Sequence, residues 1–202
     1  MSARADSVTE QVFDRRRSHL ACIAAFRDDC DELARLLQLG LDLNAPLDRS
    51  PLMCAAEHGH TAAVRFLLER KADVGQCSAF RGFAALHIAS TEGHFGVVEL
   101  LIESGADVNQ AAQGERAEWR GMTPLGVCAW SRKPPDNVAS CAKLLLQHKC
   151  DPSLPADRSA LQLARANSDF NPTAKSVANQ IELATLPDPA PPAPPAPFPG
   201  RD

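Results

Sequence analysis

The sequence contains no tyrosine, and its ten phenylalanine and tryptophan residues make up only 5% of the 202 positions. It also lacks an excess of basic charge, because its formal net charge is −4. Proteins that bind nucleic acid rely on a concentrated stripe of Lys and Arg, so this class of partner is not expected. With 45% hydrophobic and 23% charged residues, the chain can still bury an ordinary globular core.

Long apolar runs are absent as well. No run approaches the roughly 18 residues that a membrane-spanning helix requires, and residues 1–17 lack the apolar stretch of a secretory signal. The seven cysteines are odd in number and scattered, which is typical of free thiols in a reducing compartment. These features predict a cytoplasmic or nuclear protein that makes no membrane contact and is monomeric alone.

A short motif recurs along the chain. Residues 50–56, 84–90, 123–129 and 159–165 each have Leu at their third position, and a weaker copy lies at residues 21–25. In the clearest copy, the apolar run Val97–Ile102 follows the motif, and Gly-Ala-Asp-Val-Asn closes it at residues 105–109. Repeats of this length indicate a solenoid, because one unit cannot bury both of its apolar faces alone.

These residues resemble the ankyrin-repeat family, whose pattern runs T-P-L-H-x-A-A, G-H, V-V-x-L-L-L and G-A-D-V-N. The resemblance spans roughly residues 18–184 and implies an all-α solenoid of stacked helix–turn–helix units with hairpin-like fingers. The expected repeats are residues 18–46, 47–79, 80–118, 119–154 and 155–184. An N-terminal extension at residues 1–17 and a disordered proline-rich tail at residues 185–202 complete the predicted organisation.

Local signals mark the ends of the predicted helices. Ser50 and Thr123 each precede a proline, which is typical of an N-cap followed by the first helical position. Glycine follows the second helix of two copies, whereas Lys71 and Lys149 stand at the equivalent position in two others. A left-handed backbone there is predicted to cost each lysine about 1 kcal/mol.

The third copy departs from the family pattern at one position and keeps it at another. Ala84 replaces the capping Thr, which predicts a further loss of about 1 kcal/mol. His87 is the one histidine retained at its position in the motif. The resemblance implies that this side chain ties neighbouring fingers together by hydrogen bonds.

The spacing between copies identifies an irregular repeat. Leu52 and Leu86 are 34 residues apart, close to the usual ankyrin period, but Leu86 and Leu125 are 39 apart. The extra residues fall in the finger at residues 110–120, and a second insertion lies between two helices at residues 131–137. Insertions in solenoids go into loops on one face, often the binding face. Recognition is therefore predicted to concentrate around residues 110–137.

The resemblance places the finger tips and the exposed side of each first helix on a concave binding face. Trp and Arg are enriched among the residues that dominate binding energy at interfaces. The alternative for the two tryptophans is that the long finger folds back and they pack against each other. The candidate partner-binding residues are Phe26, Arg49, His58, Phe80, Arg81, Phe83, Glu92, Trp119, Arg120, Met122 and Trp130.

No motif for catalysis, a cofactor or a metal is present. Cys54, Cys128 and Cys141 occupy apolar positions of the repeat and are expected to be small core residues, and no closely spaced ligand pair such as C-x₂-C occurs. Nucleophile-elbow, phosphate-loop and H-E-x-x-H motifs are also absent. The sequence therefore predicts a non-enzymatic protein with no cofactor and no metal.

Two functions remain open. The first is a protein–protein interaction module that acts as an adaptor or a stoichiometric inhibitor through the concave face. The second is a structural tether whose proline-rich tail is the recognised element, because that tail contains P-x-x-P steps suited to an aromatic groove.

Overall fold

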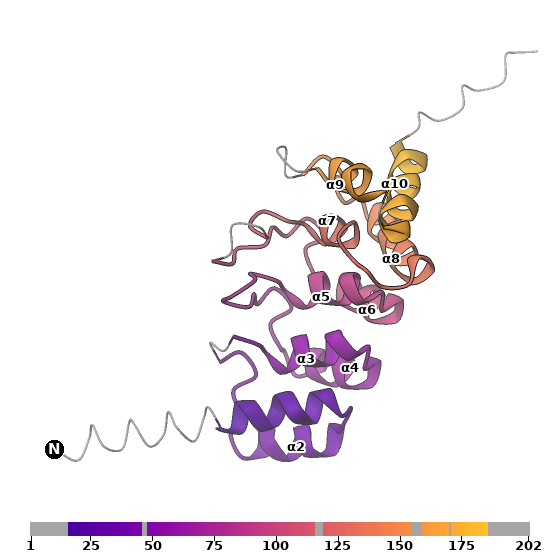
Figure 1. The fold of residues 1–202 in the computed structure, drawn as a ribbon. Coiled ribbons are helices and arrows are strands. Elements are labelled where there is room, and N and C mark those ends of the chain that lie inside the picture. Colours follow the sequence, from indigo (N-terminus) through magenta and orange to yellow (C-terminus); the bar gives the residue numbers. More distant parts are fainter. Residues whose placement is uncertain (1–15, 46–47, 116–118, 155–158, 170, 186–202) are drawn as a thin grey trace, which may run out of the picture.

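The computed structural model describes residues 16–45, 48–115, 119–154, 159–169 and 171–185. These residues form pairs of helices that stack in a single file, with the connecting fingers projecting to one side (Figure 1). First helices contact first helices of the neighbouring pairs, and second helices contact second helices. No strand occurs among the described residues, which confirms the predicted all-α solenoid.

The described helices fall into five pairs. The first pair comprises residues 16–26 and α2 (Cys30–Gln38). The others are α3 (Pro51–His58) with α4 (Thr61–Glu69), α5 (Ala85–Glu92) with α6 (Phe95–Glu103), α7 (Pro124–Cys128) with α8 (Pro135–Gln147), and α9 (Ala160–Asn167) with α10 (Pro172–Thr185). The predicted N-terminal extension lies outside the described residues up to position 15, and the predicted tail lies outside them from position 186.

The helix starts follow the signals in the sequence. The hydroxyl oxygens of Ser50 and Thr123 accept hydrogen bonds from the backbone three residues later, at 3.3 and 3.2 Å. Ala84 has no such oxygen, but its own N–H donates to Nδ1 of His87 at 3.2 Å. The histidine therefore supplies a partner at a helix start whose capping side chain is missing.

Both lysines predicted to be left-handed have that conformation. Lys71 has φ 63° and Lys149 has φ 61°, beside φ 84° at the glycine that follows α2 and φ 88° at the one that follows α6. Asp28 also has a positive φ of 57°, which the sequence did not signal. Its carboxylate accepts a hydrogen bond from the N–H of Ala63 at 2.9 Å, which holds the turn in place from the next repeat.

One apolar core runs through all five helix pairs. Leucines of the facing helices and closely packed alanines fill it, and Cys54, Cys128 and Cys141 are buried as predicted. A second, smaller cluster lies between the long finger and the first helix of its repeat. Its buried members are Phe83, Ala112, Met122 and Val127.

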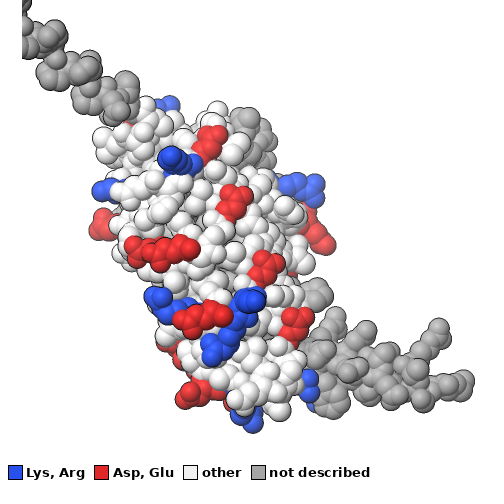
Figure 2. All heavy atoms as spheres, turned by 180° about the vertical axis from the view of Figure 1, so that it is seen from behind, with Lys and Arg blue, Asp and Glu red and all other residues white. Residues whose placement is uncertain are grey.

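Charged side chains of both signs are interspersed on the face seen in Figure 2, and neither sign forms a continuous patch there. No helix among the described residues is long and apolar enough to cross a bilayer. The surface seen in Figure 2 therefore offers no concentrated basic stripe of the kind that nucleic acid requires.

Candidate functional site

Side chains of each repeat hold the end of the preceding first helix. In every case the acceptor is a backbone carbonyl near the C-terminus of a first helix or in the turn after it, and the donor comes from the following repeat. These hydrogen bonds fix the register of neighbouring first helices. They therefore align, from repeat to repeat, the residues that follow the two alanines of the motif. The donors and acceptors are His60 Nε2 to Phe26 O at 2.8 Å, His94 Nε2 to Glu57 O at 2.9 Å, Ser131 Oγ to Thr91 O at 2.6 Å and Asn171 Nδ2 to Ser131 O at 2.8 Å.

Two adjoining hollows lie on the concave face, which we define as the fingers together with the exposed side of the first helices. They share the side chains of Asp48, Arg49 and Glu57. The first hollow lies between the helix of residues 16–26 and α3, and the second lies between α3, α5 and the finger of residues 78–83. Together they form one groove across the first three repeats, which we call the concave groove.

Two carboxylates of the concave groove form ion pairs. The guanidinium of Arg49 donates to the carboxylate of Glu57, and the Lys133 ammonium forms an ion pair with Glu92. The hydrogen bond to Glu92 raises the pKa of Lys133. Three arginines and three carboxylates line the groove and leave it close to electrically balanced, so it favours a partner segment of mixed polarity over a strongly charged one.

Three aromatic side chains stand half-exposed on the concave face. Phe26 is 52% exposed, Phe80 46% and Trp130 47%. Phe26 meets the ring of His58 edge to face, with ring centroids 4.3 Å apart. Large apolar groups held open at regular positions of one face are characteristic of a binding surface.

Two of the candidate contact residues are buried and do not stand on the open surface where the family resemblance places them. Phe83 is 4% exposed and Met122 is 1% exposed. The long finger folds back over the first helix of its repeat, and its hairpin is closed by hydrogen bonds between Ala112 and both Gly121 and Met122 at 2.8 Å. Burial beneath this finger turns both side chains into core residues.

The tryptophans pack together, as the alternative interpretation expected. Their ring centroids are 5.6 Å apart, and Trp119 also packs edge to face on Phe83 at 5.5 Å. Trp119 is partly buried against the small cluster, whereas Trp130 keeps nearly half of its surface open. The pair therefore attaches the finger and still presents one indole to solvent.

A close contact between neighbouring fingers was missed in the sequence. The N–H of Gln113 donates to the carbonyl of Gly82 at 3.3 Å. A Cβ atom on Gly82 would collide with the backbone of Gly114, and one on Gly114 would collide with the backbone of Arg81. The only signal for this contact was a glycine inside the insertion of residues 110–120.

His87 joins the third repeat to the long finger. Its Nε2 donates to the carbonyl of Met122 at 3.0 Å, while Nδ1 accepts from Ala84. The ring is fully buried and stacks on Phe83 with centroids 5.3 Å apart. Burial disfavours the charged form and lowers the pKa of His87 to about 4. The predicted finger-tying role of His87 is confirmed.

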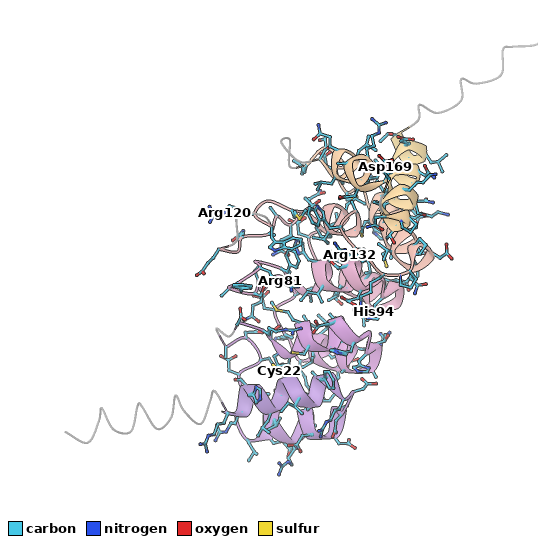
Figure 3. All side chains as sticks on the ribbon, in the orientation of Figure 1. Cys22, Arg81, His94, Arg120, Arg132 and Asp169 are labelled. Carbon is cyan, nitrogen blue, oxygen red and sulfur yellow. The ribbon has the colours of Figure 1, made fainter. Side chains whose placement is uncertain are left out.

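The remaining candidates are distributed over different surfaces. Phe26, Arg49 and His58 line the first hollow, while Arg49, Phe80, Arg81 and Glu92 line the second. Trp130 lines a separate hollow together with Pro134, Pro135 and residues of α10. Arg120 is exposed on the long finger, on the same side of the molecule as Arg81 (Figure 3).

No group of three or more potential metal ligands occurs in the part of the chain that the structure describes. A family model described as ankyrin repeats, in three copies, matches residues 19–112. The match covers the helix pairs from residue 19 through α6 and ends within the long finger, at Ala112. The insertion of residues 131–137 and most of the insertion of residues 110–120 lie beyond the matched residues.

Proposed function

We propose, on the premise that this chain belongs to the ankyrin-repeat family, that it binds another protein along the concave groove and the neighbouring Trp130 surface. Ankyrin repeats are generally non-enzymatic protein–protein interaction modules. In this proposal the chain acts as an adaptor or as a stoichiometric inhibitor that covers a surface of its partner.

The row of half-exposed aromatic side chains carries this proposal. Phe26, Phe80 and Trp130 belong to three different repeats, yet all three lie on the concave face. A partner that covered them would remove a large apolar area from water at low conformational cost, because the repeats already hold these rings in place. The paired charges between the aromatic rings would supply the polar rim of the interface.

Affinity capture with matched variants tests the proposed face. The bait Phe26→Ser/Phe80→Ser/Trp130→Ser removes the three exposed rings, and we expect it to lose the proteins that the wild-type chain captures from a native lysate. The control bait Leu39→Ser/Phe95→Ser/Leu183→Ser removes three similarly exposed apolar side chains at the second helices. Capture lost equally with both baits would contradict the assignment to the concave face.

The hypothesis that the proline-rich tail is the recognised element predicts the opposite capture results. If the chain is a tether recognised through its proline-rich segment, deleting residues 186–202 abolishes capture and the aromatic variant retains it. If the concave face binds, the deletion retains capture. Because residues 186–202 follow α10, the deletion leaves every described helix complete.

A further inference from the structure

The hollow that contains Trp130 lies between the last two repeats. Its lining residues come from the turn after α7, the end of α9 and the starts of α8 and α10, and its volume is about 680 Å³. Figure 3 labels one residue from the turn after α7, Arg132, and one from the turn after α9, Asp169. The hollow shares no lining residue with the concave groove. We call it the Trp130 hollow.

Two backbone carbonyls beside the Trp130 hollow already have donors. The side-chain amide of Asn171 donates to the carbonyl of Ser131 at 2.8 Å, and the Thr173 hydroxyl donates to the carbonyl of Lys133 at 2.6 Å. These hydrogen bonds join the start of α10 to the turn after α7. They also occupy two acceptors that would otherwise be open to a ligand.

Three donors beside the Trp130 ring have no such partner. The indole Nε1 of Trp130, the Arg132 guanidinium and the Asn167 amide form no hydrogen bond or ion pair with any residue that the structure describes. The Trp130 side chain is also 47% exposed. In the concave groove, by contrast, Arg49 donates to Glu57. The Trp130 hollow therefore favours a ligand that brings carbonyl acceptors and apolar surface.

A proline-rich backbone has this chemistry. Proline has a carbonyl acceptor but no N–H, and a polyproline II helix leaves its carbonyls without internal partners. Aromatic-lined grooves bind such segments. Residues 186–199 of this chain contain eight prolines, and Asp188 is their only charged residue. The segment that follows α10 thus matches the hollow in its acceptors and in its apolar surface.

The same segment starts within reach of the Trp130 hollow. α10 begins at Pro172, which lines the hollow, and ends at Thr185. Its 14 residues span about 20 Å. Residues 186–202 would span about 50 Å as a polyproline II helix, so the segment is long enough to return along α10. Tethering also gives the segment an effective concentration on the order of 1 mM at the hollow, which favours it over a segment on another molecule.

We propose that residues 192–199 of the chain's own proline-rich segment dock in the Trp130 hollow. Proline rings lie on the open face of the indole, and backbone carbonyls accept from Trp130 Nε1, Arg132 and Asn167. The docked segment covers a ring that a partner would contact, so it competes with that partner from within the chain. This competition rests on the proposed function, whereas the docking itself requires no partner.

Quenching of a single tryptophan tests the docking directly. Trp119→Phe keeps an aromatic ring beside Phe83 and leaves Trp130 as the only indole. Acrylamide quenching of this chain is compared with that of the same variant ended at residue 185, which retains every described helix. We expect the quenching constant of Trp130 to be about twofold lower in the full chain, because the docked segment shields the ring. Equal constants would overturn the proposal.

Trp130→Phe provides the matched control, because it leaves Trp119 as the only indole. That ring packs against Phe83 and does not line the Trp130 hollow. Its quenching constant should be the same in the full and the shortened chain. If truncation exposed both tryptophans equally, the segment would stabilise the repeats as a whole and its assignment to the hollow would be wrong. Far-UV circular dichroism verifies that each chain is folded.

A serine-substituted segment tests the ligand's chemistry. Pro192→Ser/Pro194→Ser/Pro195→Ser/Pro197→Ser keeps the length of the segment, but it adds N–H donors and removes the preference for polyproline II. We expect Trp130 of this variant to be quenched as in the shortened chain. Protection that survives the four substitutions would contradict docking of a proline-rich backbone.

A second set of variants tests the donors of the hollow. Arg132→Ala/Asn167→Ala removes two of them and should lose most of the protection of Trp130. Arg65→Ala/Lys143→Ala removes two exposed cations from α4 and α8 and should keep that protection. Equal protection in both double variants would show that the donors do not hold the segment.

Capture from a native lysate separates this proposal from the proposed function. If both are correct, the chain ended at residue 185 captures more partner than the full chain, because Trp130 is no longer covered. If quenching shows that the segment shields Trp130 but the shortened chain captures no more partner, the docking stands and the role of Trp130 in partner binding is wrong.

Protein concentration distinguishes the chain's own segment from that of a second copy. Protection within one chain should be constant between about 1 and 100 μM protein, and the isolated peptide of residues 186–202 should protect the shortened chain only near millimolar concentration. Protection that rises with protein concentration would assign the segment in the hollow to another copy and contradict the proposal.

Discussion

The repeat formed by α5 and α6 differs from the following repeat, formed by α7 and α8, in how helix length is distributed. α5 and α6 have 8 and 9 residues, whereas α7 has 5 and α8 has 13. The insertion of residues 131–137 accounts for part of the longer α8. α7 ends at Cys128, before the insertion, and the last residues of the insertion form the start of α8, where Pro135 is suited to the first helical position.

The two kinds of repeat satisfy the same acceptors with different donors. In the regular repeats, His60 and His94 reach the carbonyl of the preceding first helix. In the irregular repeat and its neighbour, Ser131 and Asn171 do so. The backbone carbonyl at a helix end requires a donor of suitable reach, and the side-chain type is secondary. Stacking therefore tolerates an insertion that removes the Gly-His pair.

The irregular repeat also uses aromatic residues differently. Phe26 and Phe80 stand open on the concave face, whereas Phe83 and Trp119 pack beneath or against the long finger. The insertion of residues 110–120 thus needs its own small core to hold it. The regular repeats consequently form the concave groove, and the irregular repeat contributes Trp130, which lines a separate hollow.

The largest expected effect concerns His87, which joins the two kinds of repeat. Its pKa is lowered to about 4 in the folded chain, against a usual value of 6.5, so the unfolded chain binds the extra proton between these values. The contribution of buried His87 to the free energy of unfolding is present above pH 6.5, and about 3 kcal/mol of it is lost as the pH falls to 4. Urea unfolding at pH 7 and pH 4.5 measures the loss. His87→Gln should show a smaller change between the two pH values, and an equal change would contradict the assignment.

The contact between Gly82 and Gly114 gives the next largest effect. Either glycine changed to Ala would force the two fingers apart, and we expect a loss of about 2 kcal/mol in the free energy of unfolding. Trp119 should become more exposed, which its fluorescence reports. The control is Gly105→Ala, where φ is +88° but no atom lies within 4 Å of the added Cβ. Backbone strain alone should cost that variant about 1 kcal/mol and leave the tryptophan signal unchanged.

Lys71 and Lys149 both have a left-handed backbone. Substituting each by glycine tests whether the regular and the irregular repeat carry equal backbone strain. Lys71→Gly lies in a regular repeat and Lys149→Gly in the irregular one, with φ values of 63° and 61°. Each substitution should stabilise the chain by about 1 kcal/mol, and the double variant should gain the sum. Thermal or urea unfolding measures these gains. A gain at only one position would show that the irregular repeat relaxes the strain in another way.

The ion pairs should contribute least. Arg49–Glu57 lies within the second repeat, between its finger and α3, and Glu92–Lys133 links a regular repeat to the irregular one. Both pairs are partly open to solvent, so Glu57→Gln or Glu92→Gln should change stability by no more than about 0.5 kcal/mol. Unfolding at low and high salt provides the measurement. A loss above about 1 kcal/mol in either variant would contradict this ranking, and in Glu92→Gln it would mean that the pair holds two repeats together.

Much of the fold followed from local patterns in the chain. Ser50 and Thr123 cap their helices, Lys71 and Lys149 adopt left-handed backbones, and His87 reaches the next finger as the family resemblance implied. These features depend on a few neighbouring residues and on the repeat period, which the sequence displays directly.

The candidate site was predicted less completely. Phe26, Arg49 and Phe80 do lie along one groove, but Phe83 and Met122 belong to a core. Repeat alignment assigns a residue to a finger without showing whether that finger folds back. An insertion has no equivalent in the other copies, so its path could not be derived from them.

By itself, the sequence determined the repeat class, the helix ends, the strained backbone positions and the location of the insertions, because each is encoded by residues close together in the chain. Only the tertiary structure decided that the tryptophans pack together and that Gly82 meets Gly114. Those contacts join a finger to a neighbouring finger or to the turn after α7, and they form only when stacked helices and folded fingers bring separate segments together.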